Sequence, residues 1–339
     1  MRDIAIIILN WNGKLFLERF LPSVMRYSDL PRVEIIVADN GSSDDSLSFL
    51  QQHYPQISII RLHKNYGFAG GYNRALQHLQ HTYFVLLNSD VEVIADWIYP
   101  LIQRMEVDRS IAVCMPKIKS WHDRNKFEYA GAAGGFIDKY GYPFCRGRYI
   151  DVVEEDNGQY NLPLEVFWAS GACMFIRADV FRFAGGFDDR FFAHMEEIDL
   201  CWRIKNLGYK VFCFPDVEVY HAGGGTLPYN TPKKIYLNFR NNLFTLYKNM
   251  LPQDFRAVFR IRIVLDLLAA LRFLLRGKFI SAVAIIIAYW AFLKNKKHYV
   301  SKKSNRLRIV EIKEIVSYSI VLEYWLHRRR KYSELSGVK

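Results

Sequence analysis

YFVLLNSDVEV, residues 83–93, is an apolar run that turns polar at one point. Tyr83 to Leu87 carry apolar and aromatic side chains, which predicts a strand buried on both faces. Asn88, Ser89 and Asp90 follow at once, and an Asx-turn explains Asn88 and Ser89 as well as a ligand does. Asp90 is a candidate ligand for Mg²⁺ or Mn²⁺, because these cations take few protein oxygens and leave other positions to substrate phosphates.

Strand and helix patterns alternate along the first half of the chain, up to and including this stretch. Alternation of this kind predicts an α/β fold, a doubly wound and mainly parallel sheet with helices on both faces. The chain of 339 residues is 51% hydrophobic, which is enough for a large core and excludes wholesale disorder. The predicted strands are 4–10, 33–40, 57–62 and 83–90, and the predicted helices are 14–27, 44–53 and 69–80.

A polar cluster follows each of these four strands, at the edge where open α/β sheets bind ligands. Asp39 ends the second strand, where its carboxylate can accept a hydrogen bond from a nucleobase imide. Helix capping explains Ser43 and Asp44 but not Asp39. The glycines of the third cluster let backbone approach a ligand ahead of a helix N-terminus that favours anions, although a plain turn fits equally well. The clusters are NWNG (10–13), DNGSSDD (39–45), NYGFAGGYN (65–73, neither Walker A nor GxGxxG) and NSD (88–90).

The acidic segment FFAHMEEIDLCWR, residues 191–203, is the strongest chemical signal. Glu196, Glu197 and Asp199 lie at the predicted start of an amphipathic helix. The helix dipole stabilises one or two acids there, but a third acid beside apolar residues is unexpected. The strand predicted at 210–221 ends at His221, with three glycines close behind. A lone histidine is more often structural than a ligand, yet its place at a strand end makes His221 a candidate.

Positive charge is concentrated in the C-terminal third of the chain. The net charge is +12, but residues 231–339 hold 23 Lys and Arg against 6 Asp and Glu, a balance of +17, and the rest stands at −5. A basic segment suits nucleic acid or an anionic membrane. Residues 262–299 are too apolar for a nucleic-acid arm. Their longest uncharged run, 279–293, is shorter than the roughly 20 residues that span a bilayer.

We therefore predict a catalytic domain over residues 1–250 and a basic, apolar helical region over 251–339. These helices are expected to lie in the membrane interface with Lys and Arg reaching the headgroups; the alternative is ordinary helices packed on the catalytic domain. The N-terminus lacks the pattern of a secretory signal. Five cysteines form no CxxC pair, which fits reduced thiols. The expected location is cytoplasmic, peripheral on the inner face of the plasma membrane, with no nucleic-acid partner.

Six motifs, taken in order, resemble the inverting family 2 glycosyltransferases, which have the GT-A fold. The resemblance covers roughly residues 1–250. It is strongest to bacterial enzymes that move rhamnose or a related deoxysugar onto the lipid precursors of polysaccharides. Those enzymes commonly carry an Asn in place of the first Asp of an Asp-x-Asp motif, as Asn88 does here. The motifs are VADNGSSDDS, NYGFAGGYN, LLNSDVEV, SGACMFIRADVF, GGFDDRFF and EEIDLCWR.

The resemblance implies roles for individual residues. Asp90 would coordinate Mg²⁺ or Mn²⁺ together with His221, which lies 24 residues beyond Glu197, as in related galactofuranosyl enzymes. Glu197 would be the catalytic base in a Glu-Glu pair that replaces the usual Glu-Asp, with Glu196 as the alternative base. The remaining assignments are Asp39 to uracil or thymine, Asn88 to the ribose, Asn10, Asn65, Gly67, Gly70, Gly71, Asn73 and Ser89 to the donor nucleotide, Trp168 and Asp199 to the acceptor, and Arg240 to a phosphate.

The implied reaction is metal-dependent transfer of rhamnose or a related deoxysugar from a dTDP- or UDP-linked donor. The acceptor would be a hydroxyl of a glycan or of a polyprenyl-diphosphate-linked glycan, in cell-surface polysaccharide synthesis. One base and one displacement imply inversion at the anomeric carbon. A sugar nucleotidyltransferase is the alternative enzyme, although LNWNGKLF (9–16) is a poor version of the basic Gly-rich loop that it would need. The third hypothesis is a catalytically inactive relative that serves as a membrane-bound partner.

Overall fold

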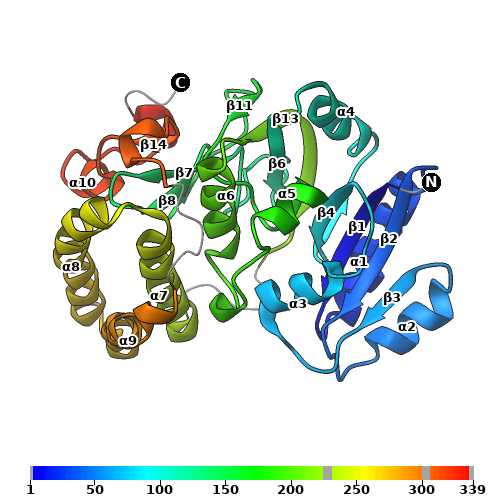
Figure 1. Ribbon diagram of the computed structural model, residues 1–339, viewed down its shortest axis with the longest axis horizontal. Coiled ribbons are helices and arrows are strands. Elements are labelled where there is room, and N and C mark those ends of the chain that lie inside the picture. The colour runs from blue at the N-terminus through cyan, green and yellow to red at the C-terminus, as the bar shows by residue number, and fades with distance from the viewer. Residues whose placement is uncertain (1–2, 224–230, 300–305, 336–339) are drawn as a thin grey trace.

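The structure, a computed structural model, describes residues 3–223, 231–299 and 306–335. Its main sheet contains four parallel strands in the order β3-β2-β1-β4 (Figure 1). Residues 4–8 of β1 are buried because β2 and β4 flank the strand and α3 packs against it. This arrangement confirms the predicted doubly wound unit. The strands are β1 (Ile4–Asn10), β2 (Val33–Asp39), β3 (Ser58–Arg61) and β4 (Tyr83–Asn88).

Three helices connect these strands. The first, α1, begins at Lys14 as predicted, and its buried Leu17, Leu21 and Val24 recur every three or four residues on one face. The third, α3, begins two residues earlier than predicted, because Gly67 with a φ of +73° lets the chain turn directly from the loop into the helix. The bounds are α1 (Lys14–Ser28), α2 (Ser46–His53) and α3 (Gly67–Leu76).

Beyond β4 the main sheet becomes mixed. Strand β12 runs antiparallel to both of its neighbours, β4 and β6, whereas β13 runs parallel to β6 and β11 antiparallel to β13. The parallel unit read from the sequence is thus extended by strands of both directions, and the fold class is confirmed. The bounds are β6 (Ile111–Ser120), β11 (Leu164–Glu165), β12 (Cys173–Arg177), β13 (Lys210–His221), α4 (Tyr99–Val107), α5 (Ala178–Phe183) and α6 (Glu196–Asn206).

A short strand after β4 positions the end of β13. This strand, β5 (Val91–Val93), pairs with β13 so that Val91 lies opposite His221. The backbone oxygen of Asp90 accepts a hydrogen bond of 3.0 Å from the N–H of Ala222. The pairing therefore brings Asp90 next to His221, although 131 positions separate them in the sequence.

A smaller sheet joins the C-terminal segment to the middle of the chain. Its strand order is β10-β9-β8-β7-β14, and β14 runs parallel to β7. The carboxylate of Asp138 ties the same two segments together, because it accepts hydrogen bonds from the N–H groups of Tyr140, Tyr142 and Ile320. The bounds are β7 (Gly135–Asp138), β8 (Pro143–Cys145), β9 (Arg148–Tyr149), β10 (Val152–Val153) and β14 (Ile315–Val316).

Three long helices dominate the C-terminal region (Figure 1). Helix α7 packs against both α6 and α9, and α8 packs against α9. Helices α7 and α8 both begin with proline, a residue suited to the first turn because that position needs no N–H partner. The domain boundary between residues 250 and 251 stays a prediction. The bounds are α7 (Pro232–Asn249), α8 (Pro252–Leu275), α9 (Phe279–Asn295) and α10 (Ile320–Trp325).

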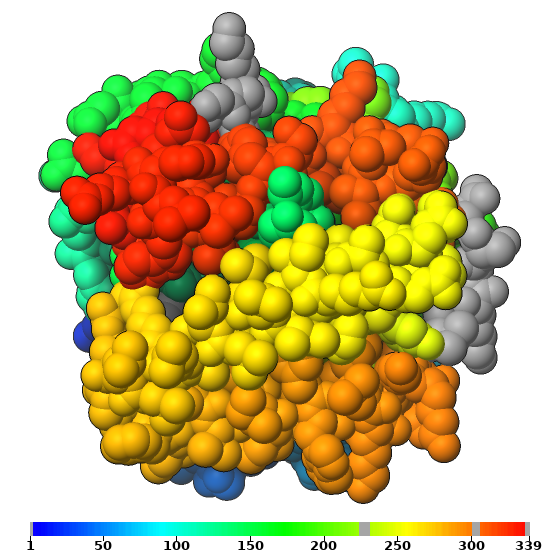
Figure 2. All heavy atoms as spheres, turned by 90° about the vertical axis from the view of Figure 1, so that its left-hand side faces the viewer, coloured from blue at the N-terminus to red at the C-terminus, as the bar shows by residue number. Residues whose placement is uncertain are grey.

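Helix α9 has apolar side chains on both of its faces. Toward the protein it buries mainly small residues, including Ala282, Ala284, Ala288 and Ala291. Size rather than polarity distinguishes its two faces, which explains why the sequence shows no amphipathic stripe. In the described part of the chain, 279–298 is the one helical stretch long and apolar enough to cross a membrane. Figure 2 shows the face that α8 and α9 form, and the large side chains exposed on α9 are Phe279, Ile280, Val283, Ile286, Ile287, Trp290 and Leu293.

Candidate active site

The ends of β4 and β13 form one polar cluster. Nε2 of His221 lies 3.1 Å from Oδ1 of Asp90 and 3.4 Å from Nδ2 of Asn88. On the other side of the ring, Nδ1 of His221 lies 3.4 Å from Oε2 of Glu128. Both carboxylates and the imidazole are buried. The structure therefore brings together Asn88, Asp90 and His221, which the sequence assigned to the ribose and the metal.

Mutual attraction keeps this cluster charged. Burial opposes a charged imidazole, but the negative charges of Asp90 and Glu128 raise the pKa of His221 well above its usual value. Burial likewise opposes the carboxylate of Asp90, yet the neighbouring His221 brings its pKa below the usual range. The carboxylate of Asp90 is thus ionised at neutral pH, as a ligand for a cation must be.

The donor set of this cluster fits a divalent cation. Asp90 offers a carboxylate oxygen, and His221 would offer an imidazole nitrogen once a cation displaces the proton from Nε2; Mn²⁺ accepts both kinds of ligand. Glu128 faces the second ring nitrogen, the position where metal-binding histidines usually meet an orienting carboxylate. Within residues 3–223, 231–299 and 306–335, no group of three or more His, Cys, Asp or Glu side chains is arranged to hold a metal. A cation on Asp90 and His221 would therefore need ligands from water or a substrate.

The ends of β1 and β2 form a second polar cluster. Nδ2 of Asn10 donates to Oδ1 of Asp39 at 3.3 Å and to Oγ of Ser42 at 3.2 Å. The N–H of Ser42 donates to Oδ2 of Asp39 at 3.1 Å. Each carboxylate oxygen of Asp39 keeps a lone pair for a further donor. Asn10 and Asp39 are buried, and Oδ1 of Asn10 has no hydrogen-bond partner among the described residues.

A buried asparagine that the sequence analysis missed organises the glycine-containing loop. Nδ2 of Asn40 donates to the carbonyl of Gly67 at 3.0 Å and to Oδ1 of Asn65 at 3.2 Å. Oδ1 of Asn65 also accepts from the N–H of Gly67 at 2.8 Å. The N–H of Phe68 donates to the carbonyl of Phe192 at 2.7 Å. These first N–H groups of α3 are engaged within the protein, which removes them from the anion site expected at this helix N-terminus.

The glycines of α3 allow close packing. At Gly67, a Cβ atom would lie 2.4 Å from the carbonyl oxygen of Phe192, and at Gly71 it would lie 2.9 Å from the side chain of Leu9. At Gly70, a Cβ would meet two neighbouring side chains at 3.1 Å. The glycines thus bring α3 against β1 and against the loop that contains Phe192. Contacts of Gly67, Gly70 and Gly71 with a nucleotide stay predictions.

Two of the predicted ligand contacts involve side chains that are already engaged in the fold. The amide of Asn73 exchanges two hydrogen bonds of 2.9 Å with the backbone of Phe187. Nε1 of the buried Trp168 donates to the carbonyl of Phe136 at 3.0 Å, and the indole packs against Gly135. Asn73 therefore ties α3 to the segment after α5. Its donor contact and the acceptor contact of Trp168 stay predictions.

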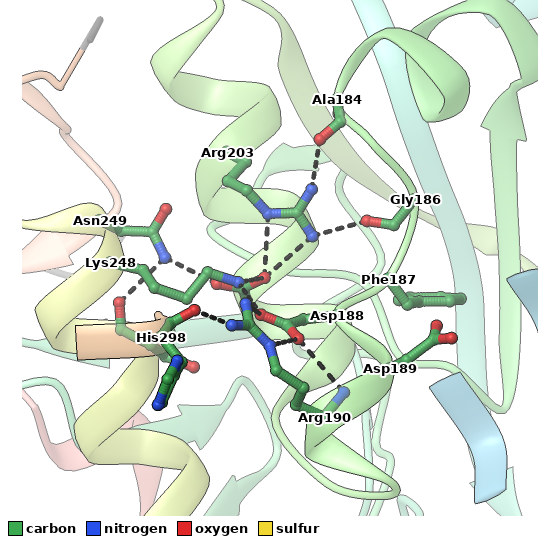
Figure 3. Close-up of polar contacts among 12 residues, drawn as sticks. Ala184, Gly186, Phe187, Asp188, Asp189, Arg190, Arg203, Lys248, Asn249 and His298 are labelled. Carbon is green, nitrogen blue, oxygen red and sulfur yellow. Dashed lines mark hydrogen bonds and ion pairs between the residues drawn. The ribbon is translucent and has the colours of Figure 1, made fainter. Parts of the chain in front are cut away.

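Asp199 lies at the centre of an ion-pair network, and Figure 3 labels its basic partners Arg203 and Lys248. Its buried carboxylate lies 2.9 Å from the guanidinium of Arg203 and 2.9 Å from Nζ of Lys248. Nδ2 of Asn249 donates to the other oxygen at 2.9 Å. Burial opposes ionisation of Asp199, but Arg203 and Lys248 bring its pKa below the usual value. Asp199 thus joins α6 to α7, and its predicted acceptor contact stays a prediction.

Glu196 and Glu197 begin α6 directly after a loop with unusual backbone angles. Phe192, His194 and Met195 have φ angles of 65°, 70° and 72°, in a region that residues other than glycine rarely adopt. Strain of this kind is concentrated at functional sites. Oε2 of Glu196 and Oε2 of Glu197 are buried, and within the described ranges neither has a hydrogen-bond partner. Unpaired buried carboxylate oxygens need a ligand or a proton.

Burial separates the protonation of the two glutamates. It raises the pKa of Glu197 to about 7. Burial and the charge of Glu197 together raise the pKa of Glu196 well above its usual value. Glu197 therefore ionises first, while Glu196 keeps its proton. Beside them, burial and the charge of Lys234 lower the pKa of His194 to about 4, so that its imidazole is neutral at neutral pH.

Lys234, in the first turn of α7, links the glutamate loop to the histidine cluster. Burial lowers the pKa of Lys234, and the charge of Glu128 works in the opposite direction. The charge of Lys234 in turn acts on His194. The charge of Lys234 thus interacts with the histidine cluster through Glu128 and with the loop before Glu196 through His194.

Asn40, Glu128 and Lys234 were missed by the sequence analysis. Asn40 follows Asp39 directly, so its place at a strand end was a usable signal. Glu128 lies in FEYAGAAGGF (127–136), where it is the one acid among small and apolar residues. Lys234 carries no signal, because only the packing of α7 shows where its side chain lies.

Comparison with known proteins agrees with this geometry. The model of Glycosyl transferase family 2 matches residues 5–183, more than half of the chain. N-acetylglucosaminyl-diphospho-decaprenol L-rhamnosyltransferase of Mycobacterium tuberculosis is 26% identical over 242 residues, 65% of this chain and 76% of that protein. Rhamnosyltransferase WbbL of Escherichia coli is 25% identical over 231 residues, 64% of this chain and 83% of that protein.

A solved structure shares the fold. GalNAc-T7, crystallised with UDP, GalNAc and Mn²⁺, superposes with a TM-score of 0.56 at 17% identity over 74% of this chain, and the chain spans about half, 49%, of that protein. The similarity supports the GT-A architecture, and the two bacterial relatives are similar to this chain over most of their own length. The chain thus belongs to glycosyl transferase family 2 and is a glycosyltransferase that resembles bacterial rhamnosyltransferases.

Proposed function

We propose that this enzyme moves rhamnose or a related deoxysugar from a nucleoside diphosphate to a hydroxyl of a lipid-linked glycan, with a divalent cation and with inversion, in cell-surface polysaccharide synthesis. The observation that carries the proposal is the presence of two buried polar pairs, Asp90–His221 in hydrogen-bond contact and Glu196–Glu197 with carboxylate oxygens that have no partner among the described residues. The first pair suits the charge of a departing diphosphate, and the second supplies a base for an acceptor hydroxyl.

The cluster at the ends of β1 and β2 is proposed to bind the donor nucleotide. Asp39 would accept the imide N–H of uracil or thymine, since both of its oxygens keep free lone pairs beside their present bonds to Asn10 and Ser42. Oδ1 of Asn10, buried and unpaired in the described structure, is available for a nucleoside donor group. Asn88, beside His221, would donate to a ribose hydroxyl.

Asp90 and His221 are proposed to hold the cation. When bound, Mg²⁺ or Mn²⁺ would offset the negative charge that develops on the leaving diphosphate. Nδ1 of His221 would keep its proton and donate a hydrogen bond to Glu128, which leaves Nε2 facing Asp90. The GalNAc-T7 structure contains UDP and Mn²⁺, which supports the use of a divalent cation.

Glu197 is the proposed base. Of the two glutamates it loses its proton first, at a pKa of about 7, which places an ionised carboxylate in the site at neutral pH. It would take the proton of the acceptor hydroxyl as that oxygen attacks the anomeric carbon from the face opposite the diphosphate. General-base catalysis of this kind contributes typically 10²–10⁴-fold in rate. One displacement inverts the configuration of that carbon.

The acceptor class is proposed from the relative of M. tuberculosis, whose name gives an N-acetylglucosaminyl-diphospho-decaprenol as its substrate. A polyprenyl-diphosphate-linked glycan lies in a membrane, and the exposed apolar face of α8 and α9 suits an enzyme that works there. Exposed cations border that face, which favours the anionic inner surface of the plasma membrane. They are Arg256, Arg260, Arg276, Lys278 and Lys294.

The function is tested with the purified full-length chain, Mn²⁺, a panel of sugar nucleotides that begins with dTDP-rhamnose, and a polyprenyl-diphosphate-linked acceptor. The proposal predicts release of a nucleoside diphosphate that depends on Mn²⁺ and on one donor. Release of pyrophosphate would identify a nucleotidyltransferase instead. No turnover with any donor, from protein that binds nucleotide, would identify an inactive relative.

The membrane face is tested by sedimentation with vesicles of phosphatidylglycerol and phosphatidylethanolamine. Changing Ile287 and Trp290 to Glu should weaken vesicle binding at least about tenfold, because each large apolar side chain contributes roughly 1.5–3 kcal/mol when it leaves water. Leu162→Glu is the matched control, since Leu162 is 78% exposed and lies outside α8 and α9. Equal binding by both variants would remove this face as the membrane contact.

A further inference from the structure

The loop before the proposed catalytic glutamates has a backbone conformation that its own residues do not favour. Phe192, His194 and Met195 adopt positive φ angles within four residues, and none of them is glycine. Each such residue costs free energy and persists only where the surroundings impose it. The next two residues are Glu196 and Glu197, so the direction of their side chains depends on whatever fixes this loop. Side chains of α7 donate hydrogen bonds to backbone carbonyls of this loop.

One side chain of α7 binds three successive parts of the loop. Nδ2 of Asn241 lies 3.0 Å from the carbonyl oxygen of Phe191, 2.9 Å from that of Ala193 and 2.8 Å from that of His194. Asn241 is fully buried, at 0% exposure. Its Oδ1 accepts a 2.8 Å hydrogen bond from Nε of Arg240, which fixes the amide with Nδ2 toward the loop. The two N–H bonds of this amide are thus shared among three carbonyl oxygens of the strained loop.

We infer that Asn241 is a positioning residue for the catalytic glutamates: through its three hydrogen bonds it holds the Phe191–Met195 loop in the strained form that points Glu196 and Glu197 into the site. The inference rests on the proposed role of these glutamates. Without Nδ2, the partly buried carbonyls of Ala193 and His194 lose this donor, while that of Phe191 keeps Arg240, and the loop can relax to ordinary backbone angles. The glutamates would then keep their chemistry and lose their orientation and burial.

Of the α7 side chains that donate hydrogen bonds to the backbone of the loop, Asn241 reaches closest to the glutamates. Arg240 binds the carbonyls of Arg190 and Phe191 at the start of the loop. Lys248 follows Asn241 by seven residues in α7; its Nζ lies 2.7 Å from the carboxylate of Asp188 and also binds α6 (Figure 3). These contacts fix the segment before the loop and the body of α6, and they leave the carbonyls of Ala193 and His194 to Asn241.

The opposite side of the loop touches the donor side of the site. The carbonyl of Phe192 accepts the N–H of Phe68 in α3, and Gly67 packs directly against Phe192. This contact holds one residue of the loop, Phe192, but not the carbonyls next to the glutamates. Loss of the Asn241 contacts should therefore disturb the base more than the donor pocket.

The test replaces Asn241 in the full-length protein. Asn241→Leu keeps a similar volume without a donor, and Asn241→Ser keeps one donor in case the leucine variant does not fold. Tyr149→Phe is the matched control, since it removes a buried 2.5 Å hydrogen bond from Tyr149 to the carbonyl of Ile320, at the C-terminal segment. The measurements are kcat, the donor KM, the melting temperature, and ¹³C NMR titration of labelled glutamate carboxyls.

The inference predicts that kcat falls about 100-fold in Asn241→Leu, as expected for a misplaced catalytic group, while the donor KM changes less than about fivefold. The carboxyl that titrates at about 7 in the wild type should titrate nearer 4.5 in the variant, because the released loop exposes it. Tyr149→Phe should lower the melting temperature and leave both readouts unchanged.

Two outcomes would overturn the inference. One is a variant at Asn241 that loses melting temperature like Tyr149→Phe but keeps its kcat and its glutamate titration. The other is a fall in kcat that is matched by an equal rise in the donor KM with the titration unmoved. The NMR titration needs no turnover, so it tests the positioning role even if the wild-type protein releases no nucleoside diphosphate and the proposed function fails.

Discussion

The two ends of the site are built in different ways. At the donor end, Asn10 and Asp39 lie on neighbouring parallel strands, and the side chains there are bonded to one another. At the glutamate end, Glu196 and Glu197 follow a strained loop and keep unpaired oxygens. The first arrangement is a hydrogen-bonded network that leaves Oδ1 of Asn10 and lone pairs of Asp39 for a ligand, as recognition requires. In the second arrangement, carboxylate oxygens lack hydrogen-bond partners and the pKa values of both glutamates are raised, as proton transfer requires. Substitutions at the two ends should therefore affect different kinetic constants.

The largest expected effect is at the glutamate end. Glu197→Gln keeps the shape of the side chain and removes the base, so we expect kcat to fall by roughly 10²–10⁴-fold. Donor affinity, measured by calorimetry, should stay within about threefold, since Asp39 and Asn10 are untouched. Glu196→Gln is the control, because Glu196 keeps its proton at neutral pH and a neutral amide should cost about tenfold or less. Normal turnover by Glu197→Gln would transfer the role of base to Glu196.

The proposed cation ligands should affect both cation binding and the chemical step. Asp90→Asn removes the charge of one proposed ligand, and we expect Mn²⁺ affinity and kcat each to fall about 100-fold. Calorimetric titration with Mn²⁺ in the presence of nucleoside diphosphate checks the affinity directly. Asp96→Asn, at an exposed position shortly after β5, is the matched control. If Mn²⁺ binds equally well to both variants, the cation is held elsewhere.

The same difference decides how much of the site could be read from the sequence. The strands and their polar ends were predictable, because the carboxyl ends of parallel strands share one edge and each strand is nearly continuous in apolar residues. Asp39, Asn88 and Asp90 are placed by that rule alone. The pairing of β5 with β13 brings His221 to Asp90, although 131 positions separate these residues in the sequence. Only the resemblance suggested that the two side chains meet.

The contacts around the glutamates were not predictable from any local pattern. Asn241 lies in the middle of α7, where asparagine is a poor helix former and no periodicity marks it as a partner of the loop. The predicted acceptor contact of Asp199 stays a prediction, and no local pattern indicates its ion pair with Lys248. The early start of α3 had a readable cause in Gly67, but the carbonyl that occupies its N-terminus comes from Phe192. Long-range packing decided each of these.

A smaller effect is expected at the donor end. Asp39→Asn keeps the bond from Asn10 and removes the charge that would accept the imide N–H. We expect the donor KM to rise roughly tenfold with kcat little changed, since a hydrogen bond to a charged group contributes about 1.5–3 kcal/mol and part of it is retained. Steady-state kinetics with the preferred donor measures this. A fall in kcat without a change in KM would mean that Asp39 acts on the chemical step.

The smallest effect concerns stability, and it follows from the burial of the glutamates. The pKa of Glu197 is about 7 in the folded protein and near the ordinary glutamate value of 4.5 in the unfolded chain. Between these values the folded state holds more protons, so the free energy of unfolding falls as pH rises from about 4.5 to about 7. Glu197→Gln removes this dependence.

The variant should therefore melt about 2–4 °C above the wild type at pH 8 and close to it at pH 5, a shift on the scale expected for roughly 1 kcal/mol. Scanning calorimetry at both pH values measures the difference, with Glu165→Gln, a partly buried glutamate on β11 outside the site, as the control. An equal melting temperature at pH 8 would mean that the site tolerates an ionised Glu197 without cost, and the unpaired oxygens would then need a partner in the free enzyme. A rise confined to high pH would show that the charge needed for proton transfer is the charge that the fold least tolerates.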